Sequence, residues 1–187
     1  MSDQVKIAVD CMGGDDDASF VIPGLSLSLK KYQGTKFQLF GDEKIIKSRI
    51  SKYKEVAAVS EIIHCDTFVK MDEKPSTAVK NGRGKSSIWL AIEALKQGNV
   101  DFMISAGNTG ALMAMSTLIL KTISKIQRPA IAAIWPTIDG ETIVLDIGAT
   151  MGFNKKQLTD FSILGASMAQ VILDVDQPTL SLLNIGE

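Results

Sequence analysis

The sequence predicts an α/β fold in which a mostly parallel β-sheet carries helices on both faces. Short apolar runs rich in β-branched residues alternate with amphipathic stretches along nearly the whole of the 187-residue chain. Several of these runs end in turns rich in glycine, aspartate and asparagine. Hydrophobic residues make up 45% of the chain and charged residues 22%, which is typical of a globular protein. Together these features favour strand–helix alternation around a buried, mainly parallel sheet.

The first part of the chain predicts three strands and two helices. The strands are expected at residues 5–11, 37–40 and 59–65. A helix follows the Gly13-Gly14 turn and continues to about Lys31. Asp42 is expected to cap a second helix at residues 43–53, because its carboxylate can accept hydrogen bonds from the free N–H groups of the first turn.

The remaining elements follow the same alternation. Helices are expected at residues 86–97, 108–124 and 157–173, and strands at residues 101–105, 130–135, 142–146 and 180–185. Gly98 is a typical stop for the first of these helices. The last strand has no crossover helix after it, although a parallel strand normally feeds one. We therefore expect a single α/β domain over residues 1–187 that is truncated at its C-terminus.

Residues 100–114 form the most informative motif: a short buried strand, a tight glycine turn and the start of a helix. At such a junction the free backbone N–H groups and the positive end of the helix dipole point at one spot. Gly107 and Gly110 let a ligand approach the main chain closely. Hydrogen-bonding side chains are supplied by Ser105, Asn108 and Thr109. The motif predicts a phosphate or oxyanion cradle, although the same pattern also suits an ordinary corner of an α/β fold.

The end of the first strand places Asp10 beside the double glycine Gly13-Gly14. In open α/β sheets, ligands bind beyond the carboxyl ends of the strands, so these residues are candidates for substrate binding. The alternative is that the glycines only shape the turn and that residues 15–17 cap the helix. No GxGxxG motif is present, which gives a dinucleotide site little support.

Residues 74–87 are interpreted as a basic, hydroxyl-rich loop. The side chains expected to bind phosphate through charge-assisted hydrogen bonds are Ser76, Thr77, Lys80, Arg83, Lys85 and Ser86. The end of the segment is similar to a P-loop, but Val79 stands where the leading glycine is required, so this is not a Walker A motif. A solvated basic loop without a ligand is the alternative.

Two further predicted strand ends carry polar residues. Asp146 and Thr150 follow one of these strands, and Asn184 and Gly186 end the other. Because the carboxyl ends of parallel strands lie at one edge of a sheet, we expect all four turns to line one crevice. Arg128 precedes a strand and is either an anion clamp or a surface charge.

Several functional classes find little support. His64 is the only histidine and no GxSxG elbow is present, which disfavours a Ser-His-Asp triad. No His, Cys and Asp cluster has ligand spacing, so we expect no metal and no organic cofactor. The net charge of −1 gives no reason to expect nucleic acid. With no signal-peptide pattern, no long apolar span and no CxxC spacing at Cys11 and Cys65, we expect a cytoplasmic protein with reduced cysteines.

Five motifs, in register over the whole chain, resemble the bacterial phosphate acyltransferase family. They are Ala8-Val9-Asp10-Cys11-Met12-Gly13-Gly14-Asp15, Met71-Asp72-Glu73-Lys74-Pro75-Ser76, Ser105-Ala106-Gly107-Asn108-Thr109-Gly110-Ala111-Leu112-Met113, Arg128-Pro129-Ala130-Ile131 and Leu182-Leu183-Asn184-Ile185-Gly186. The resemblance implies a fold similar to the isocitrate dehydrogenase and phosphotransacetylase group. It also implies transfer of a long-chain acyl group from acyl carrier protein to inorganic phosphate, which gives an acyl phosphate for bacterial phospholipid synthesis.

The same resemblance implies site roles and partners. It assigns Asn108, Thr109 and Asn184 to catalysis, and backbone N–H groups together with the basic segment to phosphate binding. It implies a homodimer, peripheral association with the cell membrane, and a functional link to a glycerol-3-phosphate acyltransferase.

The chain also departs from the family pattern. Asp16 and Ala18 stand where the family has histidine and proline, and Lys80-Asn81 stands where two arginines are common. Family members are much longer than this chain. The alternatives are therefore an inactive, truncated fragment of the enzyme, or one half of a split enzyme that needs a second chain.

Overall fold

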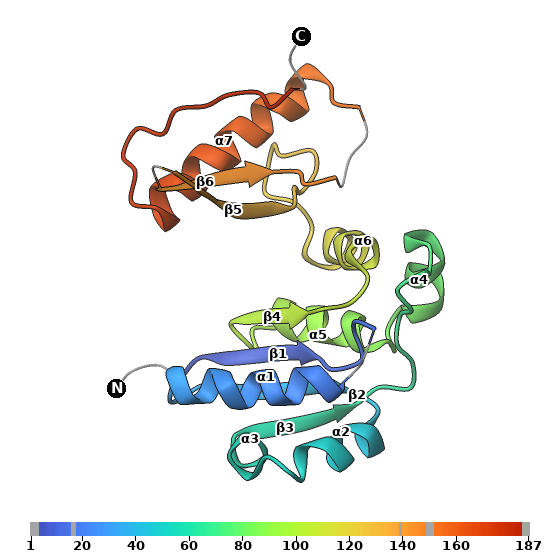
Figure 1. Ribbon diagram of the computed structural model, residues 1–187. Coiled ribbons are helices and arrows are strands. Elements are labelled where there is room, and N and C mark those ends of the chain that lie inside the picture. Colours follow the sequence, from blue (N-terminus) through green and yellow to red (C-terminus); the bar gives the residue numbers. More distant parts are fainter. Residues whose placement is uncertain (1–3, 16–17, 139, 149–151, 185–187) are drawn as a thin grey trace. The chain divides into compact units, whose positions relative to one another are not determined.

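The computed structural model describes residues 4–15, 18–138, 140–148 and 152–184 (Figure 1). Thr150 and Gly186, two of the predicted site residues, and the departure at Asp16 lie outside these ranges. The chain divides into two compact units, Met1–Lys121 and Thr122–Glu187, which are described separately below. The expectation of a single domain over residues 1–187 stays a prediction.

The first unit is built on a four-stranded parallel sheet (Figure 1). Its strands are β1 (Lys6–Asp10), β2 (Lys36–Gly41), β3 (Ser60–His64) and β4 (Phe102–Ser105), in the spatial order β3-β2-β1-β4. Every neighbouring pair is parallel. The predicted mostly parallel sheet and its first four strands are thus confirmed.

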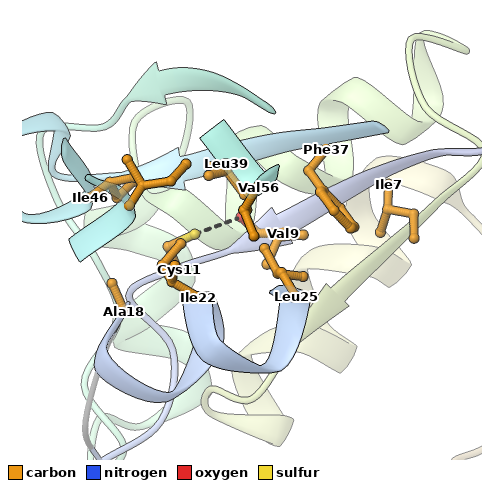
Figure 2. Close-up of a cluster of buried hydrophobic side chains, with 11 residues drawn as sticks. Ile7, Val9, Cys11, Ala18, Ile22, Leu25, Phe37, Leu39, Ile46 and Val56 are labelled. Atoms are coloured by element: carbon orange, nitrogen blue, oxygen red, sulfur yellow. Dashed lines mark hydrogen bonds between the residues drawn. The ribbon is translucent and has the colours of Figure 1, made fainter. Parts of the chain in front are cut away.

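Helices cover both faces of this sheet. On one face lie α1 (Ala18–Lys31), α2 (Glu43–Ile50) and α3 (Lys54–Ala58), and on the other lies α5 (Ser87–Lys96). Figure 2 shows the first face, where Val9 of β1 and Leu39 of β2 meet Ile22 of α1 in a fully buried cluster. Asp42 caps α2 as predicted, because its carboxylate accepts hydrogen bonds from two first-turn N–H groups.

The other two helices of this unit are α4 (Pro75–Gly82) and α6 (Thr109–Leu120). Helix α6 buries Ala111, Met115 and Ile119, a stripe with a spacing of four residues, in a cluster shared with α4 and α5. The prediction of a loop over residues 74–87 is wrong for its first half, which is α4. Pro75 occupies the first helical turn, where its missing N–H costs nothing, and Ala78 is buried on the inner face.

The second unit contains a two-stranded antiparallel sheet of β5 (Ala132–Thr137) and β6 (Gly140–Leu145) and the helix α7 (Lys155–Ile172). Both strands were expected, but their placement in the parallel sheet is wrong. Only two residues separate them in the sequence, and a parallel pairing needs a crossover of a dozen or more residues. Helix α7 packs on β6, and Asn154 and Gln157 form a capping box at its start.

The strand predicted at residues 180–185 is also wrong over its described part, because residues 180–184 form no strand. An apolar run becomes a strand only when a neighbouring strand accepts and donates its backbone hydrogen bonds. Among the described residues, no helix combines the length and the apolar character that a membrane span requires.

We predict that Asp160 makes the stability of the second unit depend on pH. Lys156 donates a hydrogen bond to this carboxylate, which holds its pKa below the ordinary value of 3.8, and the Gln127 N–H also donates to it. A lowered pKa stabilises the fold above the ordinary value, and this contribution is lost as the pH falls through the folded-state pKa. Asp160→Asn should therefore weaken the amide protection of α7 at neutral pH, and the difference from wild type should shrink at about pH 3.

The measurement is amide hydrogen exchange across α7, with Asp176→Asn as the matched control in the same unit. An equal loss of protection at both pH values would contradict the ionic origin of the effect.

Candidate functional site

The turns that follow β1 and β4 pack directly against each other. The Ser105 hydroxyl donates to Asp10 Oδ2 at 2.8 Å, and the same Ser105 oxygen accepts a hydrogen bond from the Gly107 N–H at 3.0 Å. A Cβ atom at Gly13 would lie 2.6 Å from the Gly107 nitrogen and 2.8 Å from its Cα. The backbones of the two turns are therefore as close as two glycines allow. Gly14, at φ +94°, continues the first turn past Ala106.

Asp10 is the carboxylate at the centre of this contact and is only 2% exposed. Burial raises the pKa of the Asp10 carboxyl, while hydrogen bonds from Ser105 and from the N–H groups of Met12 and Gly13 oppose that rise. The Ser87 hydroxyl, at the start of α5, also faces this carboxyl and favours its charged form. The Ser87 hydroxyl forms no hydrogen bond by geometry, so we infer that it stabilises the Asp10 carboxylate less than Ser105 does. These hydrogen bonds thus reduce the free-energy cost of a buried charge on Asp10 without abolishing it.

Asn108 ties the start of α6 to the segment that precedes α4. Its Oδ1 accepts a hydrogen bond from the Ala111 N–H, which makes it the N-cap of α6. Its Nδ2 lies within hydrogen-bond distance of three main-chain carbonyls, those of Lys70, Met71 and Glu73. The side chain is therefore committed to contacts within the chain on both of its polar atoms.

The N-terminus of α4 lies beside that of α6. A Cβ atom at Gly110 would come within 2.7 Å of Pro75 Cγ. Ser76 and Thr77 follow Pro75 in the first turn of α4, and Thr109 opens α6. Neither first turn contains an acidic residue, so the positive ends of both helix dipoles are unneutralised by their own side chains. Two helix N-termini side by side favour a negative ligand.

The three basic residues predicted to bind phosphate, Lys80, Arg83 and Lys85, come after Ser76 and Thr77, whereas Lys74 is the N-cap of α4. Lys80 is in its last turn, and Arg83 and Lys85 come after its end. Lys80 lies three and four residues after Thr77 and Ser76, about 6 Å or less along the helix axis, so it is on the neighbouring turn of the same helix. The Arg83 guanidinium lies 6.0 Å from the centre of the Trp89 ring. The predicted single loop is therefore a helix that carries Ser76, Thr77 and Lys80 on adjacent turns, followed by a short segment that carries Arg83 and Lys85.

Ser86 has a local role. It is fully buried and caps α5 by accepting a hydrogen bond from the Trp89 N–H. Its predicted contact with phosphate stays a prediction.

A cleft of about 490 Å³ opens beside the cationic end of α4. Lys70 and Glu73 line one part of it, and Asn81 and Lys85 another; the remaining lining residues are Thr67, Phe68, Val69, Ala78 and Gly82. Lys70 and Glu73 are also held by the Asn108 amide through their carbonyls. The same segment thus borders both the cleft and the start of α6.

The other predicted site residues belong to the second unit. Arg128 and Asn184 are exposed, and Asp146 follows β6 with a φ of +60°. Both carboxylate oxygens of Asp146 are shielded, and among the described residues they have no hydrogen-bond partner. The premise that four strand ends share one sheet edge is wrong for β6 and for residues 180–184, because β6 pairs only with β5 and the latter is not a strand. The turns after β1 and β4 do meet.

The cysteines offer no nucleophile at neutral pH. Cys11 and Cys65 are both buried, and burial raises the pKa of the Cys65 thiol to about 12. Burial likewise raises the pKa of Cys11.

Comparison with known proteins identifies the family. A family model described as "Fatty acid synthesis protein" matches residues 5–187. The chain belongs to this family. A phosphate acyltransferase of Rhodopseudomonas palustris (strain BisA53) is 50% identical over 186 residues, which is all of this chain and 53% of that protein. A phosphate acyltransferase of Chelativorans sp. is 50% identical over 182 residues, covering 97% of this chain and 52% of that protein. The chain thus spans about half the length of these curated relatives.

Solved structures confirm the fold predicted from the family resemblance. A phosphotransacetylase from Streptococcus pyogenes matches with a TM-score of 0.66 at 15% identity, over 94% of this chain and 56% of that one. The EutD phosphotransacetylase from Staphylococcus aureus matches with a TM-score of 0.60 at 18% identity, over 89% of this chain and 53% of that one. At these identities the match concerns the fold alone.

We predict that Asn108→Ala destabilises the first unit by about 2 kcal/mol, because it removes a helix cap and leaves three carbonyls without their shared donor. Asn99→Ala is the matched control, since the Asn99 amide donates only to the exposed Gln97 side chain. Denaturant unfolding measures both variants. Equal effects of the two substitutions would contradict a special role for the Asn108 contacts.

We also predict opposite effects of alanine at two glycines. Gly13→Ala should destabilise the first unit by about 1–3 kcal/mol, because the added methyl group meets the Gly107 backbone. Gly24→Ala should stabilise α1 by up to about 1 kcal/mol, because nothing lies within 4 Å of the new atom and alanine favours a helix. Unfolding curves of both variants test this pair. A Gly13→Ala protein as stable as wild type would show that the two turns are not in close contact.

Proposed function

We propose that this chain contributes to a phosphate acyltransferase that transfers a long-chain acyl group from acyl carrier protein to inorganic phosphate. Membership of the family over residues 5–187, with relatives named phosphate acyltransferase at 50% identity, carries this proposal. The adjoining N-termini of α4 and α6 support it, because a phosphate anion is what such a pair of helix ends binds.

The reaction needs an oriented nucleophile and a polarised thioester. A phosphate oxygen attacks the thioester carbonyl carbon, the new C–O bond forms, the C–S bond breaks, and the thiol of the carrier protein leaves with the proton of the phosphate. Because phosphate is a fair nucleophile and a thioester a good electrophile, holding both in line supplies much of the rate enhancement. Hydrogen bonds to the developing oxyanion supply more.

The proposal divides these tasks among the residues at the start of α6. Among the described residues, the N–H groups of Thr109 and Gly110 have no partner within the chain, as the first turn of a helix requires, and they hold the phosphate. The Thr109 hydroxyl donates to the oxyanion. Asn108 holds the 70–73 segment in place, because its own polar atoms are already committed. Lys80, Arg83 and Lys85 attract the anionic substrates.

The remaining assignments extend the same proposal. Asn184 is a second oxyanion donor, and Arg128, Asp146, Thr150 and Gly186 contact the substrates. The enzyme is a homodimer at the membrane surface, and its acyl phosphate product passes to a glycerol-3-phosphate acyltransferase.

The direct test is phosphate-dependent release of free carrier protein from palmitoyl-acyl carrier protein by the purified chain. Release that depends on phosphate, and that falls with Asn108→Ala under conditions in which the variant remains folded, supports the proposal. A folded chain that binds phosphate but releases no carrier protein would favour the alternatives, an inactive fragment or one half of a split enzyme.

Two substitutions at Thr109 distinguish the proposed role of its N–H group from that of its hydroxyl. Thr109 is the first residue of α6, where proline is tolerated, so Thr109→Pro removes the N–H group while the helix remains. We expect Thr109→Pro to weaken phosphate binding about tenfold, and Thr109→Ala, which keeps the N–H, to lower kcat with little change in phosphate affinity. Lys155→Pro, at the first position of α7, is the matched control.

Phosphate titration followed by amide chemical shifts measures the affinity. Equal phosphate affinity in Thr109→Pro and wild type would refute the proposed role of this N–H group.

A further inference from the structure

We propose that Asp10 is a positioning residue, which acts through Ser105 to fix the path of the Gly107 turn and thereby the direction of the free N–H groups of α6. This inference rests on the proposed phosphate site at the start of α6. Asp10 does not touch the ligand in this account.

The first step is that Asp10 determines how the Ser105 hydroxyl points. Asp10 Oδ2 accepts a hydrogen bond from the Ser105 hydroxyl, with 2.8 Å between the two oxygens, and a charged carboxylate is an acceptor only. The hydroxyl hydrogen is thereby directed to β1, and the lone pairs of the Ser105 oxygen remain available on its other side. One of them accepts the Gly107 N–H at 3.0 Å.

The second step is that the Gly107 N–H is directed inward. It is the N–H group that a ligand at this turn would otherwise meet before reaching the helix. Because Ser105 occupies it, the donors left for a ligand are the N–H groups that follow, those of Asn108 and of the first turn of α6. The Asn108 side chain is occupied as well, since it caps the helix and holds the 70–73 segment.

The third step is that the Gly107 turn packs closely against Asp10 and Gly13, with no room for an added side-chain atom. Adding a Cβ atom at Gly107 would place it 3.1 Å from Gly13 Cα and 3.4 Å from Asp10 Oδ2. The turn therefore lies on Asp10 and Gly13 from one side and is held by Ser105 from within. A loss of the Asp10 acceptor lets the turn move, and the N–H groups of α6 move with it.

The burial of Asp10 agrees with this role. At 2% exposure the carboxylate is out of reach of a ligand at the start of α6. A buried carboxylate is retained at a cost, and here its hydrogen bonds join two turns that come from strands 95 residues apart in the sequence.

The test compares Asp10→Asn, Ser105→Ala, Ser105→Thr and the double variant Asp10→Asn with Ser105→Ala in the 187-residue chain. Asp101→Asn is the matched control, because Asp101 is an exposed carboxylate near the opposite end of β4 that accepts the Lys6 N–H at 2.7 Å. Each protein is measured for thermal unfolding, for amide exchange at Gly107 and for binding of inorganic phosphate by amide chemical shifts.

We expect Asp10→Asn and Ser105→Ala each to speed Gly107 exchange and to weaken phosphate binding about tenfold, with the double variant no worse than either single one. Ser105→Thr keeps the hydroxyl and should bind phosphate as wild type does. Asp101→Asn should change neither readout. A purely structural role for Asp10 would lower the melting temperature and leave the phosphate affinity of the folded protein unchanged.

The inference is overturned if Asp10→Asn leaves phosphate affinity at the wild-type level, or if the two single effects multiply in the double variant. Should Asp10→Asn fail to fold, Ser105→Ala against Ser105→Thr decides, since the two differ in the bridging hydroxyl. A wild-type chain that binds no phosphate refutes the proposed function instead, and faster Gly107 exchange in Asp10→Asn would then still show that Asp10 holds the turn.

Discussion

The hydrogen bonds of the buried Asp10 carboxylate are the interaction on which the arrangement at the carboxyl end of the first unit's sheet depends. The carboxylate joins the end of β4 to the end of β1 through the Ser105 hydroxyl, and the Met12 N–H of the turn after β1 also donates to it. A carboxylate at this depth is costly unless donors surround it, and its hydrogen-bond donors, Ser105 at the end of β4 and the N–H groups of Met12 and Gly13 after β1, lie at the carboxyl end of the sheet. Burying the Asp10 carboxylate costs free energy, and the hydrogen bonds that offset this cost hold the main chain of the turns after β1 and β4 in place.

The sequence predicted the elements of this edge better than their contacts. The strands β1 to β4 and the Asp42 cap could be predicted because apolar runs and capping side chains are local signals. The Asn108 contacts could not, because their partners are main-chain carbonyls 35 to 38 residues away, and a carbonyl has no side-chain signature. The role of Ser87 beside Asp10 is equally invisible, since a serine at a helix start is ordinarily a cap.

Two errors had a signal that the sequence did contain. The six residues between the predicted strands 130–135 and 142–146 are too few for a parallel crossover, so an antiparallel pair was the better prediction. The Lys74-Pro75 step marks the start of α4, because proline is favoured in the first turn of a helix. In both cases the composition of the segment suggests one structure, while the length of the connection or its first residues indicate the observed one.

Main-chain donors also explain how a site of this kind accommodates changed side chains. Lys80 and Asn81 stand where the family commonly has two arginines, and both lie in the last turn of α4, about 6 Å along the helix axis from its first turn. The N–H groups of Thr109 and Gly110 are fixed by the path of the backbone, and we propose that this path is set by Asp10, Ser105 and Asn108, which fit the family motifs. Replacing an arginine at the far end of α4 removes a bidentate contact but leaves these donors where they are. In the proposed site, side-chain charge and main-chain orientation therefore depend on different residues, and the chain departs from the family pattern in the first while keeping the residues proposed to determine the second.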